Sequence, residues 1–169
     1  YALAVEEFDD DITEIAERPG GDDDSDSEVG HWWRKKKVAF STYLSKDYTS
    51  LGRGQHIRFD RVLLNDGNGY KAAIGVFCAP YSGVYMFTYV VAQKHRAEVR
   101  VKLVVDGRII NGAVAEGRHS YDDSQGTNTA IIRVRKRGHV WLEAHSGNHI
   151  EGDTTNYRYS TFSGFLLYN

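Results

Sequence analysis

The chain has 169 residues, with 21 Lys and Arg against 23 Asp and Glu, and a formal net charge of −2. This balance indicates neither nucleic acid nor an anionic membrane as a partner. Its single cysteine, Cys78, excludes an intrachain disulfide, and no apolar run is long enough to cross a membrane. The length predicts one domain with a tail.

The N-terminal segment is rich in acidic residues. Residues 1–17 place Phe8, Ile12 and Ile15 at positions i, i+4 and i+7, on one face of a helix. This apolar seam is shorter than an isolated helix needs in water. We therefore predict a short helix or extended tail that packs on the body or on a neighbouring subunit, with a trimerising coiled coil as the alternative. Residues 18–30, rich in Gly, Ser and Asp, are predicted to form a flexible linker.

Residues 59–89 contain two runs of β-forming residues, separated by Gly, Asn and Pro. In the second run Tyr85, Phe87 and Tyr89 occupy every other position. A period of two with aromatic residues on one side predicts a strand that turns an aromatic stripe into a core. Asn68-Gly69 suits a tight turn that needs positive φ.

More strands are predicted in the rest of the body. Alternating apolar residues over 99–105, followed by Asp106-Gly107, predict a hairpin, and Arg137-Gly138 predicts another. The remaining predicted segments are strands over 38–44, 129–135, 139–145 and 158–168 and a loop over 48–58. About ten short strands without a helical period in the body predict an all-β sandwich.

The spacing of eight residues resembles the signature of the complement C1q globular head domain: Phe59, Asn65, Tyr70, Phe77, Gly83, Tyr85, Phe87 and Tyr89. The similarity extends upstream to residues 38–41 and downstream to residues 138–142 and 162–167. One departure is His139, where the family usually has Asp after the Gly.

This resemblance implies an all-β, ten-stranded jelly-roll β-sandwich (C1q/TNF-like) for residues 38–169, with residues 1–37 as a short acidic N-terminal extension. It also implies a homotrimer, with higher oligomers of trimers as a further step, and a secreted, extracellular location. There is no Gly-X-Y repeat, so a collagen stem is excluded within this chain.

Two polar loops are the expected sites of function, because a rigid sandwich carries function on its connections. Residues 115–128 and 145–159 combine the carboxylate, amide, imidazole and aromatic groups that sugar recognition needs. An arginine there can also clamp a sugar carboxylate bidentately. The predicted ligand-binding residues are Arg118, His119, Tyr121, Asn148, Tyr157 and Arg158. The alternative is that these are ordinary solvated loops whose Asx residues satisfy local turns.

The same loops contain metal-ligand residue types. His145, His149 and Glu151 suit zinc or copper, although their spacing on a flexible loop is a weak signal. The resemblance implies calcium, which several relatives bind at the trimer apex through loop acids, and Asp106 is placed near one such acid. The predicted metal ligands are Asp106, Asp122, Asp123, His145, His149 and Glu151.

The predicted function is that of a secreted, trimeric, lectin-like pattern-recognition protein of innate immunity, which binds glycans on microbial or host surfaces. This prediction follows from the resemblance to short, collagen-less invertebrate (mollusc-type) C1q-domain proteins. The alternatives are an extracellular matrix protein that binds calcium or transition metals, as in biomineralisation, and a TNF-like receptor ligand. We predict no enzyme, no nucleic-acid partner and no membrane insertion. The sequence has neither a nucleophile elbow nor a glycine-rich phosphate loop, and Cys78 beside Phe77 is predicted to be a core residue.

Overall fold

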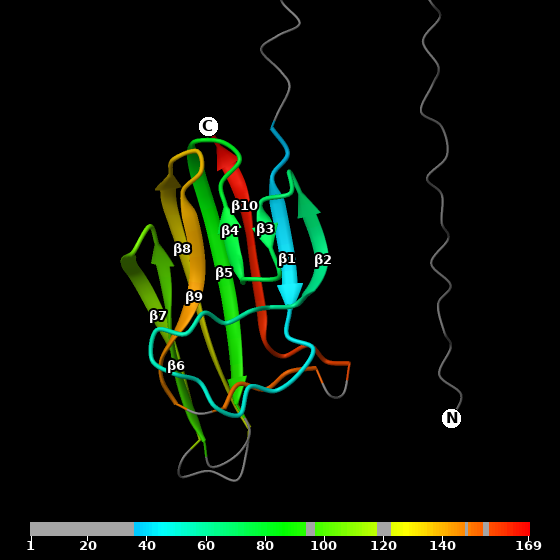
Figure 1. Ribbon diagram of the computed structural model, residues 1–169, viewed down its shortest axis with the longest axis vertical. Coiled ribbons are helices and arrows are strands. Elements are labelled where there is room, and N and C mark those ends of the chain that lie inside the picture. The colour runs from blue at the N-terminus through cyan, green and yellow to red at the C-terminus, as the bar shows by residue number, and fades with distance from the viewer. Residues whose placement is uncertain (1–35, 94–96, 118–122, 148, 154–155) are drawn as a thin grey trace, which may run out of the picture. The chain divides into compact units, whose positions relative to one another are not determined.

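The protein is described here from a computed structural model, which describes residues 36–93, 97–117, 123–147, 149–153 and 156–169. This part of the chain contains ten strands and no helix (Figure 1). The strands are β1 (Ala39–Tyr43), β2 (Arg61–Asp66), β3 (Tyr70–Lys71), β4 (Val76–Cys78), β5 (Gly83–Gln93), β6 (Glu98–Val105), β7 (Arg108–Glu116), β8 (Ser124–Val134), β9 (His139–Gly147) and β10 (Thr161–Tyr168). The predicted N-terminal helix or tail and its linker lie outside the described residues.

The strands form two antiparallel sheets of five strands each. One sheet has the order β2-β1-β10-β5-β8, and the other has the order β3-β4-β9-β6-β7. Strands distant in sequence, such as β1 and β10, lie side by side because the connections pass repeatedly from one sheet to the other, as in a jelly roll. The predicted ten-stranded jelly-roll sandwich is therefore confirmed.

The aromatic stripe predicted on β5 is also confirmed. Tyr85, Phe87 and Tyr89 have no exposed surface, whereas Met86 and Thr88 between them are only partly buried. Successive side chains of a strand point to opposite faces, so the three rings enter the space between the sheets while the intervening residues face outward.

Phe40 of β1 lies at the centre of a cluster of aromatic rings in this core. Its ring centroid is 4.9 Å from that of Phe162 in edge contact, and 5.0 Å from those of both Tyr70 and Phe77 in stacked contacts. Each such pair contributes about 0.5–1.5 kcal/mol beyond the burial of ring surface. Gly164 leaves room for the cluster, because a Cβ there would lie 2.8 Å from Phe40 Cε1. The rings come from both sheets and hold them together.

Two predicted tight turns have the expected left-handed backbone, and one of them is shifted by a residue. Asp106 and Gly107 have φ values of 47° and 81° and join β6 to β7, as predicted. After β2, positive φ falls on Gly67 and Asn68 instead of Asn68 and Gly69. Gly69 is buried, and a Cβ at this position would clash with a core phenylalanine ring. The glycine is needed there for close packing.

The strands continue further into the two predicted polar loops than expected. β7 ends at Glu116 and β8 begins at Ser124, which pairs with Gln93, so part of residues 115–128 is strand. His145 lies on β9. Polar residues suit the start of β8 because β8 is an edge strand with one exposed face. The prediction from composition therefore assigned these residues to a loop.

Cys78, predicted to be a core residue, is only partly buried. Its neighbour Phe77 takes the inward position in the aromatic cluster, and Cys78, the next residue of β4, turns toward the other face. Cys78 is therefore not a core residue, contrary to the prediction.

Candidate functional site

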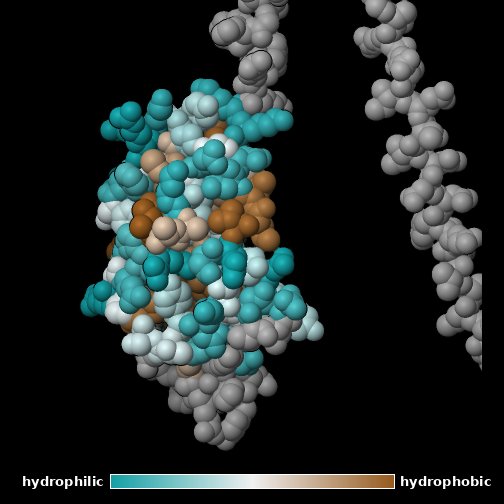
Figure 2. Space-filling view, turned by 45° about the vertical axis from the view of Figure 1, so that its right-hand side comes forward, coloured by the Kyte–Doolittle hydropathy of each residue, from teal (hydrophilic) through white to brown (hydrophobic). Residues whose placement is uncertain are grey.

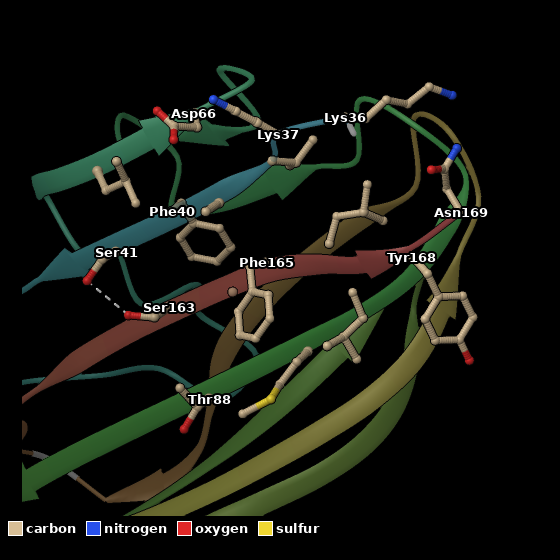
Figure 3. Close-up of a pocket in the computed structure, with 17 residues that line it drawn as sticks. Lys36, Lys37, Phe40, Ser41, Asp66, Thr88, Ser163, Phe165, Tyr168 and Asn169 are labelled. Atoms are coloured by element: carbon tan, nitrogen blue, oxygen red, sulfur yellow. Dashed lines mark hydrogen bonds between the residues drawn. The ribbon is translucent and has the colours of Figure 1, made fainter. Parts of the chain in front are cut away.

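An apolar groove lies on the outer face of the sheet that contains β1, β10 and β5. It has a volume of about 840 Å³ and is lined by outward-facing residues that include Leu64, Met86, Phe165 and Leu167. Phe165, Leu167 and Leu64 keep 42%, 41% and 41% of their surface exposed. Figure 3 shows Phe165 in the middle of this groove, next to the hydrogen bond of 3.0 Å that Ser163 donates to Ser41.

Exposed apolar residues also occur elsewhere on the body. Figure 2, which turns the β1–β2 side forward, shows brown apolar surface amid hydrophilic residues. On the edge strands β7 and β8, Ile109, Val114 and Ile131 are 61%, 47% and 61% exposed. Monomeric proteins rarely expose large apolar patches without a partner. The groove and the β7–β8 edge are therefore candidate contact surfaces.

The described part of the predicted site lies at one end of the sandwich, except for Asp106. Gln93 pairs with Ser124 and Val99 with Gly147, so the connections β5–β6, β7–β8 and β9–β10 meet at this end, here called the loop end. Asp106 lies in the β6–β7 turn at the opposite end, where its Oδ1 accepts a hydrogen bond of 2.7 Å from the His139 backbone N–H. One ion could not bind both Asp106 and the loop-end ligands.

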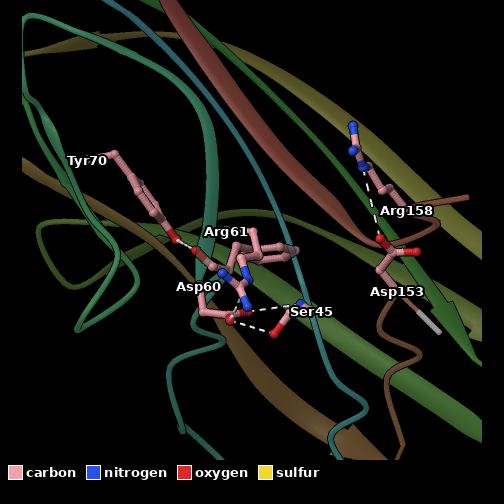
Figure 4. A network of polar contacts seen from close by, with 7 residues as sticks. Ser45, Asp60, Arg61, Tyr70, Asp153 and Arg158 are labelled. Carbon is pink, nitrogen blue, oxygen red and sulfur yellow. Dashed lines mark hydrogen bonds and ion pairs between the residues drawn. The ribbon is translucent and has the colours of Figure 1, made fainter. Parts of the chain in front are cut away.

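Two of the predicted ligand-binding residues are described, and they are neighbours. Arg158 lies with Nε 3.9 Å from Asp153 Oδ2 (Figure 4), and its guanidinium lies 4.7 Å from the centroid of the Tyr43 ring. Tyr157 is 71% exposed, and its ring stacks on that of Tyr159 with centroids 5.6 Å apart. The loop end therefore carries an exposed aromatic ring at residue 157 and, at the next residue, an arginine that Asp153 and Tyr43 already engage. Arg118, His119, Tyr121 and Asn148 lie outside the described residues.

The described residues do not assemble the predicted metal site. Among them, no three His, Cys, Asp or Glu side chains are placed to hold one ion. His149 Nε2 lies 3.4 Å from Asp47 Oδ2, and Asp47 Oδ1 accepts a hydrogen bond of 2.8 Å from the Gly152 backbone N–H. This pair anchors residues 149–153 to the loop after β1. His145, Glu151 and Asp123 also lie in the loop-end region, whereas Asp122 is outside the described residues, so calcium remains a prediction.

Similarity to known proteins identifies the family of this chain. A model of the C1q domain matches residues 39–167. The chain belongs to the C1q domain family. Human complement C1q tumor necrosis factor-related protein 3 is 34% identical over 134 residues, which are 78% of this chain and 52% of that protein. The chain thus spans about half the length of this relative.

Solved structures share the fold of this C1q domain. The globular domain of zebrafish complement 1qA has a TM-score of 0.64 at 19% identity, over 79% of this chain and 99% of that one. Eiger TNF from S. frugiperda has a TM-score of 0.65 at 7% identity, over 80% and 95% of the two chains. Murine APRIL at pH 5.0 has a TM-score of 0.57 at 9% identity, over 78% and 100%. The described residues contain no helix that is long and apolar enough to cross a membrane.

The loop after β1 contributes to the loop end of this C1q domain, which the sequence did not indicate. Tyr48 exchanges backbone hydrogen bonds of 2.9 and 3.0 Å with Ile150, and the Leu44 carbonyl accepts one of 2.8 Å from the Asp153 N–H. About 100 residues separate these partners, and nothing in their local pattern shows the pairing. Only the isolated acids Asp47 and Asp60 in an otherwise weakly patterned segment could have drawn attention to it.

Glu143 of β9 forms an ion pair on the outer face of the second sheet. Lys102 Nζ lies 2.7 Å from Glu143 Oε1, and the Trp141 indole N–H donates to Oε2 at 3.2 Å. Burial raises the pKa of Glu143, but the hydrogen bonds from Lys102 and Trp141 outweigh it and leave this pKa below the ordinary value of 4.5. Glu143 is therefore ionised and paired at neutral pH.

A pH-dependent loss of stability is expected for Glu143→Gln. A folded-state pKa below the unfolded one means that ionised Glu143 stabilises the fold at neutral pH, and that this contribution is lost as pH falls through the folded pKa. We expect the substitution to lower the free energy of unfolding by about 1 kcal/mol at pH 7, and this difference to disappear as the pH falls below the ordinary value of 4.5 and through the lowered pKa of Glu143. Denaturant titrations of both proteins at neutral and acid pH measure this, and an equal difference at both would contradict the role of the charge.

Proposed function

We propose that this C1q domain forms a secreted homotrimer that recognises glycans on microbial or host surfaces in innate immunity. Support for the trimer comes from the apolar groove around Phe165, which Ile131 extends because it pairs with Met86, and from the separate exposed residues Ile109 and Val114 on β7 of the other sheet. Two different patches on one body favour a head-to-tail contact, which closes into a ring when the rotation between subunits allows it. Threefold symmetry would then point the three loop ends in one direction.

The observation that carries glycan recognition is the exposed Tyr157 ring at the loop end, followed in the chain by Arg158. An aromatic ring packs on the apolar face of a sugar, and an arginine binds hydroxyl or carboxylate groups. Single sugar sites of this open kind are weak, and three of them on a rigid trimer gain affinity for a multivalent surface without new contacts.

A glycan array with the intact protein tests this proposal, first in calcium and then in excess chelator. We expect selective binding to one class of sugar, and loss in chelator would support calcium at or beside the site.

Tyr157→Ala should weaken binding at least about tenfold, because a stacked ring contributes roughly 1–3 kcal/mol. Leu63→Ala removes a side chain that is 54% exposed on β2 and is the matched control. An intact trimer that binds no sugar under either condition would exclude glycan recognition.

Two other functions would give different results in the same experiments. A protein that handles calcium or transition metals should take up the ion whether or not Tyr157 is present. A TNF-like receptor ligand should bind a protein partner saturably, and neither sugar nor chelator should compete. The structural similarity to Eiger TNF and APRIL supports their shared fold only, so it does not favour the receptor ligand.

A further inference from the structure

A separate polar pocket lies close to the loop end, between the loop after β1, the segment before β2 and the β3–β4 turn. Its volume of about 430 Å³ falls within the roughly 300–1,000 Å³ that is usual for ligand pockets. Its walls carry the charged residues Lys46, Asp47, Arg58 and Asp60. Among the described residues, none that the sequence predicted to bind ligand lines this pocket.

The pocket walls are fixed by hydrogen bonds. Ser45 donates to Asp60 twice, from its backbone N–H to Oδ1 at 2.9 Å and from its hydroxyl to Oδ2 at 2.6 Å (Figure 4). Tyr48 is held by its two backbone bonds to Ile150, and its phenol oxygen accepts a bond of 3.3 Å from the Arg58 N–H. A ligand would therefore meet a largely preformed site and lose little affinity to the ordering of loops.

The acids and the cations of the pocket differ in their partners. Asp47 is bonded to Gly152 and lies near His149, while Asp60 is bonded to Ser45. Burial raises the pKa of Asp60, but the two bonds from Ser45 and the nearby Arg61 outweigh it and hold this pKa below its ordinary value. Lys46 and Arg58 are both exposed and form no close ion pair with a described residue, although the Arg58 side chain interacts with Tyr48 and, at longer range, with Asp60, which raises the pKa of Arg58. The pocket therefore offers two cations to an external anion.

The remaining groups of the pocket suit hydroxyls. Each oxygen of an ionised carboxylate accepts two hydrogen bonds, so Asp60, which is 48% exposed, keeps acceptor capacity after binding Ser45. The phenol of Tyr48 can donate as well as accept. Ala72 and Ala73 add two small apolar side chains to the lining. A sugar ring has this combination of hydroxyls around its edge and C–H groups on its face.

We propose that this pocket binds the acidic sugar unit of a glycan, with Lys46 and Arg58 holding its carboxylate and Asp60 accepting its hydroxyls. The inference rests on the proposed glycan recognition and makes its ligand class specific. Asp47 connects the pocket to residues 149–153, and Arg158 is paired to Asp153 in that segment.

The test uses the intact protein and two small probes, the methyl glycosides of N-acetylneuraminic acid and of glucuronic acid, in titration calorimetry. The methyl esters of the same sugars lack the charge and serve as ligand controls. We expect the ester to bind at least about tenfold more weakly, because a charge-assisted hydrogen bond contributes roughly a factor of ten to a hundred in affinity. Lys46→Gln with Arg58→Gln should weaken binding of the acid by a similar factor.

Arg53→Gln with Lys136→Gln is the matched control. Both residues are exposed and lie outside the pocket, and the two substitutions remove the same charge as the pocket variant. Unchanged binding by this control, with loss in the Lys46 and Arg58 double variant, supports the proposal. If the array shows sugar binding that the double variant keeps, or binding of neutral sugars only, the pocket assignment is wrong while glycan recognition stands. If neither the array nor the acid probes show binding, both proposals fall.

Discussion

Replacing Phe165 by arginine is expected to convert the proposed trimer into a 19.1 kDa monomer that keeps its fold. Phe165 points outward from β10 in the middle of the apolar groove and is 42% exposed when the chain is alone. In the proposed trimer a neighbouring subunit would cover this ring. The arginine would then place a charge without a partner in an apolar contact. Loss of a central aromatic residue costs about 2–4 kcal/mol at one interface, and a ring has three equal interfaces.

Analytical ultracentrifugation at micromolar concentration measures the change, and a thermal melt shows whether the sandwich remains folded. Ile74→Arg is the matched control, because Ile74 is 54% exposed in the β3–β4 turn and lies outside the groove. We expect this control to sediment like the unsubstituted protein. A trimer that survives Phe165→Arg would show that the groove is not the contact surface. An unsubstituted chain found only as a monomer would exclude the trimer itself.

The fold was largely predictable because its information is local and repeated. The alternation of Tyr85, Phe87 and Tyr89 gave the orientation of β5, and Asp106-Gly107 gave a hairpin turn. Such patterns depend on the geometry of one strand or one turn, which neighbouring residues determine. The eight-residue signature then indicated the order of strands, which no local pattern contains. Strand ends were less certain, since polar residues such as Ser124 occupy an exposed edge strand as well as a loop.

The site was less predictable because its contacts join distant parts of the chain. Ser45 with Asp60 and Asp47 with Gly152 come together only after the two sheets have formed. Local composition singled out Arg158 as a candidate ligand-binding residue, but could not show that Asp153 and Tyr43 already engage it. Composition also grouped Asp106 with the acids of the loop end, although Asp106 lies at the opposite end of the sheet. Lys46 and Arg58 drew no attention, since an exposed cation is ordinary until its surroundings are known.

Replacing Phe40 by alanine is expected to lower the free energy of unfolding by about 3–5 kcal/mol, a large part of the roughly 5–15 kcal/mol that usually stabilises a domain. Phe40 is 2% exposed and contacts rings from both sheets, so its removal leaves a cavity that neither sheet can fill alone. Denaturant unfolding at one fixed protein concentration measures the change, because any assembly adds a concentration-dependent contribution.

Two further substitutions separate cavity formation from a general sensitivity to mutation. Phe40→Leu should recover part of the loss, because leucine fills more of the space than alanine but loses the ring contacts to Tyr70 and Phe77. Ile74→Ala removes an exposed side chain and should change stability by no more than about 0.5 kcal/mol. If Phe40→Ala cost as little as Ile74→Ala, the ring cluster would not be the close-packed core that its centroid distances indicate. The sandwich would then depend on its strand pairing more than on its aromatic residues.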